Sequence, residues 1–230
     1  MSTALITGAS RGLGVVAARR LAAQGWTVLA GCREPARLAA TLTAADGDIR
    51  PIPLDVTDDA SVEATVKEVS AHTDTLDVLV NNAAIVGVMS EPAVASVEDL
   101  RAAYETNVFG PVRVTRPFLP LLRRSAVPRL VMVSSSLGSL AEMSDWRWDN
   151  HPHLAYPSAK AALNMLSVMY AKTVPDVLVT VVNPGFTATD LNDHQGTQTV
   201  EEGTDAIVAA ALDTTGPSGR FLDRFGTVPW

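Results

Sequence analysis

The chain has 230 residues, of which 47% are hydrophobic and 19% charged, and its formal net charge is −7. This length suits one large domain, and the acidic balance argues against a nucleic-acid binder, which needs a surplus of lysine and arginine. The single cysteine, Cys32, excludes a disulfide within the chain and fits a reducing compartment. Residues 3–7 already resemble a buried strand without a basic segment before them, and no apolar run reaches the roughly 18 residues of a membrane helix. We therefore expect a cytoplasmic protein with no membrane span.

Short apolar runs alternate with helical patterns along the whole chain. In chain order, the predicted strands are residues 3–7, 26–31, 49–54, 76–81, 129–135, 177–184 and 219–222. The predicted helices are residues 12–24, 34–45, 58–71 after the N-cap Asp58, 97–124 with an interruption near Gly110 and Pro111, 156–173 and 200–212. Continuous apolar strands are typical of a parallel sheet that is buried on both faces. The pattern predicts one α/β domain over residues 1–230, a doubly wound parallel sheet of about seven strands with helices on both faces.

A glycine-rich segment follows the first predicted strand. Residues 7–14 are TGASRGLG, in which Gly8, Gly12 and Gly14 permit a tight turn and a close approach of the backbone to a diphosphate. The N-terminus of the next helix adds free N–H groups and the positive end of the helix dipole. Because the segment stands between a strand and a helix, we expect a Rossmann-type domain that binds a dinucleotide. The alternative is an ordinary turn from strand to helix.

The end of the second strand indicates which dinucleotide would bind. A carboxylate there would bind the 2′-hydroxyl of NAD, whereas a basic residue accommodates the 2′-phosphate of NADP. This chain has Cys32 followed by Arg33, and Arg11 in the glycine segment adds a second positive charge. Since arginine can bind a phosphate through two hydrogen bonds, we expect NADP(H) in preference to NAD(H). The alternative is that Arg33 is an ordinary surface residue at a helix start.

Tyr156 and Lys160 stand four residues apart in a predicted helix, so their side chains share one face, one turn apart. The pKa of free tyrosine is about 10, and a nearby ammonium together with the positive charge of an oxidised nicotinamide would lower it. Tyr156 could then protonate a carbonyl oxygen or accept the proton in the reverse reaction. Pro157 is tolerated in a first helical turn, so the helix should start near residues 154–156 with Tyr156 at its mouth.

Several segments, in matching order over nearly the whole chain, resemble the classical short-chain dehydrogenases/reductases, and the chain resembles a carbonyl-reductase-like member. They are TGASRGLG (7–14), LDV (54–56), NNAA (81–84), Asn107 in ETNVFG, VSSS (133–136), YPSAK (156–160) and NPGFTAT (183–189). The resemblance implies a catalytic tetrad of Asn107, Ser135, Tyr156 and Lys160. Ser135 is selected among three serines because the family serine stands three residues before a glycine, here Gly138.

The resemblance also implies a role for each member of the tetrad. Ser135 would hydrogen-bond the reacting oxygen as negative charge develops. Lys160 would hold the nicotinamide ribose, and Asn107 would anchor a water that links Lys160 to solvent. The expected cofactor-binding residues are Gly8, Ser10, Arg11, Gly12, Leu13, Gly14, Cys32, Arg33, Asp55, Val56, Asn82, Ala83, Tyr156, Lys160, Pro184, Gly185, Thr187 and Thr189.

Three features depart from the usual family pattern. Ala84 replaces a glycine, the separation from Ser135 to Tyr156 is about eight residues longer than usual, and the segment 190–199, where many members have a substrate lid, is short. Residues 136–155 show no regular pattern, and long loops in compact domains are often functional. Trp146 and Trp148 in this loop could line a pocket for a bulky carbonyl compound, cover helix faces used for dimers, or anchor the loop. His151 and His153 have Asp145 and Asp149 near them in the sequence but no thiolate and no third histidine, so no metal is expected.

Our main hypothesis is an NADPH-dependent reductase that transfers hydride to a ketone or aldehyde. A secondary-alcohol dehydrogenase that uses NAD(P) is the same chemistry in reverse, and a non-catalytic NADP(H)-binding sensor is the alternative from another class. The intact Ser135, Tyr156 and Lys160 argue against the sensor. The expected partner is a small-molecule carbonyl or alcohol substrate, with no nucleic acid and no membrane. Monomer, homodimer and homotetramer stay open.

Overall fold

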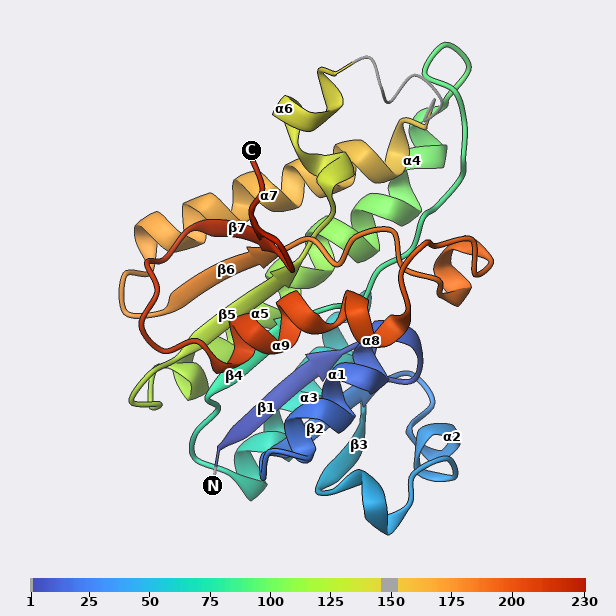
Figure 1. Ribbon diagram of the computed structural model, residues 1–230. Helices are drawn as coiled ribbons and strands as arrows, with labels where there is room; N and C mark the ends of the chain where they lie inside the picture. The colour runs from blue at the N-terminus through green and yellow to red at the C-terminus, as the bar shows by residue number, and fades with distance from the viewer. Residues whose placement is uncertain (1, 146–152) are drawn as a thin grey trace.

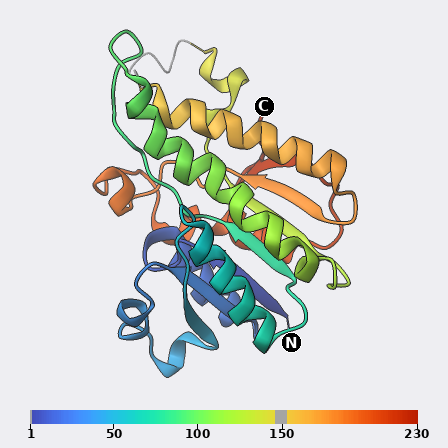
Figure 2. The same ribbon diagram turned by 180° about the vertical axis from the view of Figure 1, so that it is seen from behind.

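The computed structural model describes residues 2–145 and 153–230 (Figures 1 and 2), so Trp146, Trp148 and His151 lie outside it. The strands are β1 (Thr3–Thr7), β2 (Thr27–Cys32), β3 (Ile49–Pro53), β4 (Val78–Asn81), β5 (Arg129–Val133), β6 (Leu178–Val182), β7 (Arg220–Asp223) and β8 (Gly226–Thr227). The α-helices are α1 (Gly12–Ala22), α2 (Pro35–Ala39), α3 (Asp59–His72), α4 (Val97–Tyr104), α5 (Gly110–Leu122), α6 (Leu140–Met143), α7 (Ala155–Thr173), α8 (Val200–Gly203) and α9 (Asp205–Leu212). Short 3-10 turns occupy Ala44–Asp46, Ser136–Gly138 and Asp190–Asn192, and Glu105–Phe109 is a π-helical turn.

In the part of the chain that is described, the strands form one sheet of eight in the order β3-β2-β1-β4-β5-β6-β7-β8. Strands β1 to β7 run parallel, and β8 is antiparallel to β7. The chain winds outward from β1 to β3 and then crosses to the other side of β1 at β4, which is the doubly wound order. The expected single α/β domain is confirmed, and the added eighth strand is the two-residue end of a hairpin.

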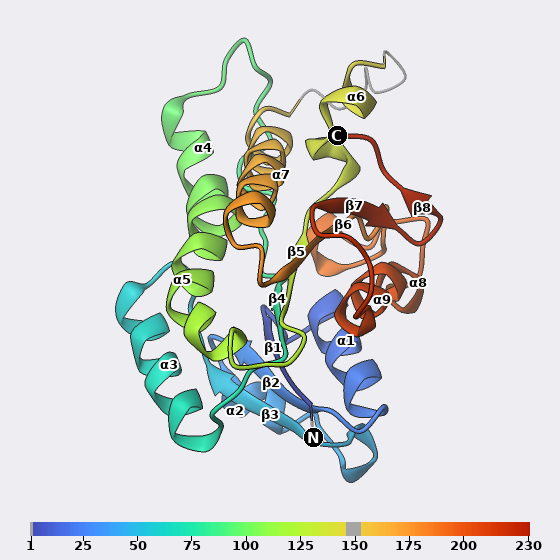
Figure 3. The same ribbon diagram turned by 90° about the vertical axis from the view of Figure 1, so that its left-hand side faces the viewer.

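The strands are continuously apolar because each face of the sheet is covered by helices. Ala4 and Ile6 of β1 pack in one cluster with residues of α1 and α9, whereas Leu5 between them packs in a second cluster with residues of α3, α5 and α7. Figure 3 shows the sheet between these two sets of helices. Successive side chains of a strand point to opposite faces, so most positions of a strand buried in this way are apolar, and the buried polar exceptions lie mainly at strand ends, as Thr3 and Thr7 do in β1.

Two predicted helices differ from the structure. The stretch 97–124 does not break at Gly110 and Pro111; instead α4 continues through the π-turn Glu105–Phe109 into α5. Pro111 lacks the N–H that a continuous helix would pair with a carbonyl oxygen of the preceding turn, and the π-turn directly before it is where the hydrogen-bond pairing of the helix changes. The predicted helix 34–45 is only α2, because Leu38 is its single buried residue and Thr43 starts a separate 3-10 turn by capping Asp46.

Two further segments are more divided than predicted. The described part of the segment 136–155 is not irregular: it contains a 3-10 turn and α6, which Ser139 caps by accepting a hydrogen bond from the Glu142 N–H. A serine followed three residues later by a glutamate is a sequence signature of a helix start. The predicted helix 200–212 divides at Thr204 into α8 and α9. None of the described helices is both long and apolar enough to cross a membrane.

Candidate active site

A cavity of about 270 Å³ lies at the carboxyl ends of the parallel strands, where the chain order reverses between β1 and β4. Open α/β sheets bind ligands at this switch point. Of the predicted cofactor residues, all except Gly185 and Thr187 line the cavity. The lining also includes residues to which the sequence assigned no role: Leu54, Thr57, Ala84, Ile85, Thr106, Val133, Ser134, Asp190 and Leu191. Most of them adjoin an assigned residue at the same strand end, and this adjacency is the signal that could have found them.

The glycine segment is held against the end of β4 by hydrogen bonds between side chains and backbone. The Thr7 hydroxyl accepts hydrogen bonds from the N–H groups of Asn82 and Ala83, each at 3.0 Å, and the Asn82 amide donates to the Thr7 carbonyl oxygen at 2.9 Å. A Cβ on Gly14 would stand 2.5 Å from the Gly8 carbonyl oxygen, and Gly8 has a φ of +65°. Both positions therefore require glycine, and the loop presents main chain to the cavity.

The two arginines expected near the cofactor differ in their surroundings. Arg33 is exposed at the end of β2, and its charge acts on Asp55 of the facing loop. Partial burial would raise the pKa of the Asp55 carboxyl, but hydrogen bonds from Thr57 and the charges of Arg33 and Arg113 leave that pKa below its usual value. Arg11 already forms an ion pair with Asp190, with 3.0 Å between Nη1 and Oδ2. Of the two arginines that line the cavity in the described part of the chain, Arg11 is thus paired with a carboxylate and Arg33 is not.

Helix α7 starts at Ala155, as the position of Pro157 predicts, and brings Tyr156 and Lys160 to the cavity. Lys160 is 2% exposed, and its Nζ donates a hydrogen bond to the Val133 carbonyl oxygen at 2.8 Å. The same Nζ lies 5.5 Å from the centroid of the Tyr156 ring. The predicted pair therefore forms, and it faces the same cavity as the glycine segment.

The three serines after β5 have different partners, which separates their roles. Ser134 is buried and donates its hydroxyl proton to Asn164 at 2.6 Å. Ser135 accepts a hydrogen bond from the Leu137 N–H at 3.2 Å, which leaves its own proton free, and its hydroxyl is hydrogen-bonded to Tyr156. Ser136 contributes its backbone N–H to Asn183. Of the three, Ser135 is the one in contact with the phenol.

Burial dominates the protonation of both groups on α7. It raises the pKa of the Tyr156 phenol to about 12, and the hydrogen bond with Ser135 offsets only part of this rise. Burial lowers the pKa of the Lys160 amine to about 7. The sequence predicts the opposite direction for the phenol, because it weighs the ammonium but not the low polarity around the ring. With protein groups alone, the phenol keeps its proton at neutral pH.

Asn107 is fully buried in the π-turn and does not line the cavity. Its side-chain amide donates to the Ile85 carbonyl oxygen at 2.8 Å and accepts from the Ile85 N–H at 3.0 Å. Ile85 and the neighbouring Thr106 do line the cavity. The side chain of Asn107 therefore fixes the wall of the site that follows β4.

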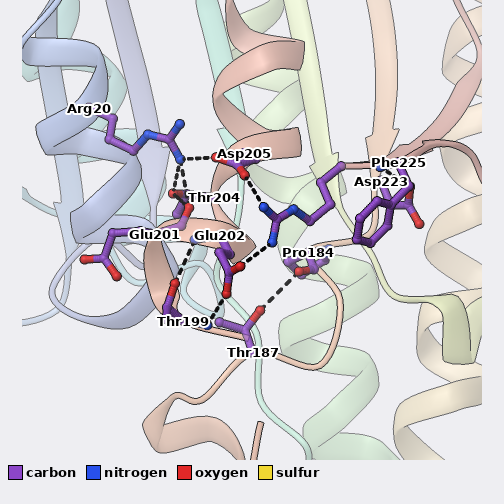
Figure 4. Close-up of polar contacts among 11 residues, drawn as sticks. Arg20, Pro184, Thr187, Thr199, Glu201, Glu202, Thr204, Asp205, Asp223 and Phe225 are labelled. Carbon is purple, nitrogen blue, oxygen red and sulfur yellow. Dashed lines mark hydrogen bonds and ion pairs between the residues drawn. The ribbon is translucent and has the colours of Figure 1, made fainter. Parts of the chain in front are cut away.

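Ion pairs join α8 and α9, which follow the segment after β6, to Arg224 and to α1 (Figure 4). Arg224 binds Glu202 of α8 at 2.8 Å and Asp205 of α9 at 3.3 Å, and Asp205 also binds Arg20 of α1 at 2.9 Å. Gly203 packs so closely on Thr187 that a Cβ there would clash with the threonine hydroxyl. Thr187 donates its hydroxyl proton to the carbonyl oxygen of Pro184 at 3.1 Å; Pro184 lines the cavity, whereas Thr187 does not.

The last residues of the chain lie beside the turn that follows Ser135. Ser139 is fully buried and donates its hydroxyl proton to the Pro229 carbonyl oxygen at 2.7 Å. The Ala141 N–H donates to the Trp230 carbonyl oxygen at 2.9 Å, and the Trp230 ring lies 5.3 Å from that of Phe221. Trp230 is 41% exposed and does not line the cavity.

No group of three or more metal-binding side chains gathers anywhere in residues 2–145 and 153–230. A glycine loop at the switch point of a doubly wound sheet, with Tyr156 and the buried Lys160 at the same cavity, defines the class of short-chain dehydrogenases. A family model described as short chain dehydrogenase matches residues 2–199. The chain therefore belongs to the short-chain dehydrogenase family, whose members are oxidoreductases that act on alcohol or carbonyl groups.

Similar proteins agree with this assignment. The chain is 36% identical over 225 residues to short-chain dehydrogenase anuI of Penicillium roqueforti, covering 91% of this chain and 88% of that protein. It superposes with a TM-score of 0.89 on an NADPH-bound carbonyl reductase from chicken fatty liver, at 27% identity and covering 100% and 99% of the two chains. It also superposes with a TM-score of 0.87 on a short-chain dehydrogenase/reductase from Burkholderia multivorans with bound NADP, at 26% identity and covering 100% and 99%.

Proposed function

We propose that the protein is an NADPH-dependent reductase that transfers hydride to a ketone or aldehyde, with Tyr156 as the general acid. The observation that carries this proposal is the shared cavity: the glycine segment and Arg33 line one part of it, and Tyr156 and Lys160 line another. The proposal would extend to this chain what the two solved relatives suggest by their bound NADPH and NADP. Alcohol oxidation would use the same groups in the reverse direction.

The residues that line the cavity suit a dinucleotide. The first turn of α1 has no side-chain cap, so its N–H groups are available to a diphosphate. The backbone of the glycine segment lies bare beside them because no side chain fits at Gly14. Arg33 supplies an exposed cation where a 2′-phosphate would sit, and Asp55 and Val56 form the neighbouring wall.

Bound NADPH would supply the hydride, and the chain's own residues would manage the proton. Tyr156 holds its proton at neutral pH and can release it to a carbonyl oxygen in the cavity. Ser135 can hydrogen-bond the same oxygen, since it already contacts the phenol. Lys160 uses one donor on Val133 and keeps two for the ribose hydroxyls. A phenolate that forms beside Lys160 favours the charged amine, which in turn stabilises the phenolate.

The decisive variant is Tyr156→Phe, assayed for NADPH oxidation with a panel of small and bulky ketones and aldehydes. We expect carbonyl-dependent turnover to fall by roughly a hundredfold or more, because the proton donor is lost. The dissociation constant for NADPH, measured by fluorescence titration, should change little. Tyr170→Phe is the matched control, since Tyr170 lies on the same helix but outside the cavity.

Each other outcome has a definite meaning. Turnover by Tyr156→Phe at the wild-type rate would overturn the general-acid role. Tight NADPH binding without turnover by the wild-type protein across the panel would favour the sensor. Tighter binding of NADH than of NADPH would overturn the cofactor preference.

A further inference from the structure

Ser135 lies in the turn formed by residues 134–138, and both ends of this turn are hydrogen-bonded to one side chain, that of Asn164 on α7. The Ser134 hydroxyl donates to Asn164 Oδ1 at 2.6 Å, and Asn164 Nδ2 donates to the Gly138 carbonyl oxygen at 3.0 Å. Ser134 is 1% exposed and Asn164 is 5% exposed, and Gly138 is buried as well. Water therefore cannot easily replace either bond, and the position of residues 134–138 follows the position of Asn164.

Only an amide of this length satisfies both partners. A carbonyl oxygen can only accept, so the amide nitrogen must face Gly138 and the amide oxygen must face the Ser134 hydroxyl. A carboxylate at this position would place an oxygen against the Gly138 carbonyl oxygen. An apolar side chain would leave the buried Gly138 carbonyl oxygen without this donor, and would leave the Ser134 hydroxyl with only the longer contact to the Lys160 carbonyl oxygen at 3.5 Å.

Asn164 belongs to the same helix face as the catalytic pair. Tyr156, Lys160 and Asn164 follow one another at intervals of four residues on α7. Gly138 lies so close to this face that a Cβ on it would stand 2.6 Å from the carbonyl carbon of Lys160. The turn that carries Ser135 is thus packed directly on the helix that carries the phenol.

We propose that Asn164 is a positioning residue. It holds the serine turn at the point along α7 where the Ser135 hydroxyl reaches the Tyr156 oxygen. Asn164 is 5% exposed and bonds to Ser134 and Gly138 on either side of Ser135, so it acts through the serine turn and not on the cofactor or substrate. This inference rests on the proposed reductase function for its kinetic consequence. Its structural consequence, the contact between Ser135 and Tyr156, is independent of any substrate.

The kinetic test is a double-mutant cycle with Asn164→Ala and Ser135→Ala. We expect Asn164→Ala to lower kcat by about tenfold to a hundredfold, because small displacements of a catalytic group have effects of this size. The KM for NADPH should stay within about twofold of wild type. In the Ser135→Ala background the same change should lower kcat by less than about twofold, because the group it positions is already absent. An equal loss in both backgrounds would overturn the inference.

Two further variants keep the test valid if Asn164→Ala folds poorly. Ser134→Ala removes one hydrogen bond of Asn164 and leaves the Gly138 bond in place, so it should lower kcat in the same direction but less. Ser167→Ala is the control, because Ser167 is equally buried on α7 but, among the described residues, its hydroxyl bonds within its own helix, to the Leu163 carbonyl oxygen. A loss of kcat in Ser167→Ala as large as that in Ser134→Ala would show a general effect of the helix and contradict the inference.

A readout without substrate separates this inference from the proposed function. The protein has three tyrosines, so the 13Cζ resonance of Tyr156 can be assigned in labelled protein by its loss in Tyr156→Phe. Asn164→Ala and Ser135→Ala should shift this resonance in the same direction. An unchanged resonance in a folded Asn164→Ala protein would overturn the inference. A shifted resonance in a protein that reduces no carbonyl compound would support the positioning role and contradict the proposed function.

Discussion

The Lys160 ammonium donates a hydrogen bond to the Val133 carbonyl oxygen at 2.8 Å, at the end of β5. This bond ties α7 to the strand that leads into the serine turn, and it places a cation in a site with 2% exposure. A buried amine without a carboxylate partner is costly to keep charged, which is why the pKa of Lys160 falls to about 7. Its charge state therefore links the stability of the fold to pH.

We predict that replacing Lys160 by Met changes how the stability of the cofactor-free protein depends on pH. The pKa of Lys160 is about 7 in the folded protein, against an ordinary value of 10.5. Between these two pH values the unfolded chain binds more protons at this lysine than the folded protein does, so the free energy of unfolding of the wild type rises with pH. Below pH 7 the lysine is charged in both states, and the folded protein bears the full cost of the buried charge. Lys160→Met should remove this contribution and be more stable than wild type near pH 6, by on the order of a few kcal/mol.

Urea unfolding at pH 6, 8 and 9.5 measures this difference. Lys172→Met is the matched control, because Lys172 is exposed near the end of the same helix. The difference between Lys160→Met and wild type should shrink as pH rises, whereas that for Lys172→Met should stay constant. A constant difference for Lys160→Met would contradict the lowered pKa.

We predict that Arg33 discriminates between the two dinucleotides. Arg33→Ala should raise the dissociation constant for NADPH by roughly tenfold to a hundredfold, because hydrogen bonds between arginine and the 2′-phosphate are lost. The dissociation constant for NADH should change by less than about twofold, since NADH has no 2′-phosphate for Arg33 to bind. Arg37→Ala is the control, as Arg37 is exposed nearby but does not line the cavity. An equal loss for both cofactors in fluorescence titrations would exclude this role.

We predict that Asp190 weakens cofactor binding by holding Arg11 in an ion pair. Asp190 lines the cavity and forms an ion pair with Arg11 at 3.0 Å, so its charge both competes for that arginine and repels phosphates. Asp190→Asn should tighten NADPH binding by about two- to fivefold at low salt, and less at high salt, because both groups are largely exposed. Asp193→Asn, in the same segment but outside the cavity lining, should have no effect. Weaker binding by Asp190→Asn would show that the ion pair supports the site.

We predict that Gly138 admits no side chain. In Gly138→Ala the added Cβ would stand 2.6 Å from the Lys160 carbonyl carbon, so the serine turn must move off α7. Overpacking of this kind costs about 1–3 kcal/mol of stability. The loss of kcat should exceed what the fraction of unfolded protein explains. Gly25→Ala provides the comparison, because a Cβ there meets no atom within 4 Å although its φ is +82°; it should lower the unfolding midpoint and leave kcat of the folded protein unchanged.

The sequence could predict the parts of the molecule that depend on local pattern. Buried parallel strands are continuous apolar runs, the loop from β1 to α1 needs its glycines, and Pro157 marks the start of α7. These features placed Tyr156 and Lys160 at one cavity with the glycine segment, as the structure has them. The family resemblance, and not the pattern alone, singled out Ser135.

The remainder depends on contacts between residues far apart in the chain. The bonds of Asn164 to Ser134 and Gly138 span 30 and 26 residues, and no pattern along the sequence reveals them. The pairing of Arg11 with Asp190 likewise depends on how the segment after β6 folds back. The pKa of Tyr156 with protein groups alone lies above its ordinary value, because desolvation of the phenol depends on the whole site and not on the neighbouring lysine in the sequence. Trp146 and Trp148 lie outside the described residues, so their three alternative roles stay predictions.

The docking of residues 229 and 230 beside Ser139 and Ala141 has a practical consequence for anyone who makes the protein. A purification tag joined after Trp230 would disturb the contacts of residues 229 and 230 with Ser139 and Ala141, which follow the serine turn. We expect such a tag to lower turnover while the protein stays folded. A tag joined before Ser2 would emerge at the amino end of β1 (Figure 1), whereas the cavity lies at the carboxyl ends of the parallel strands. A recombinant protein should therefore carry its purification tag at the N-terminus.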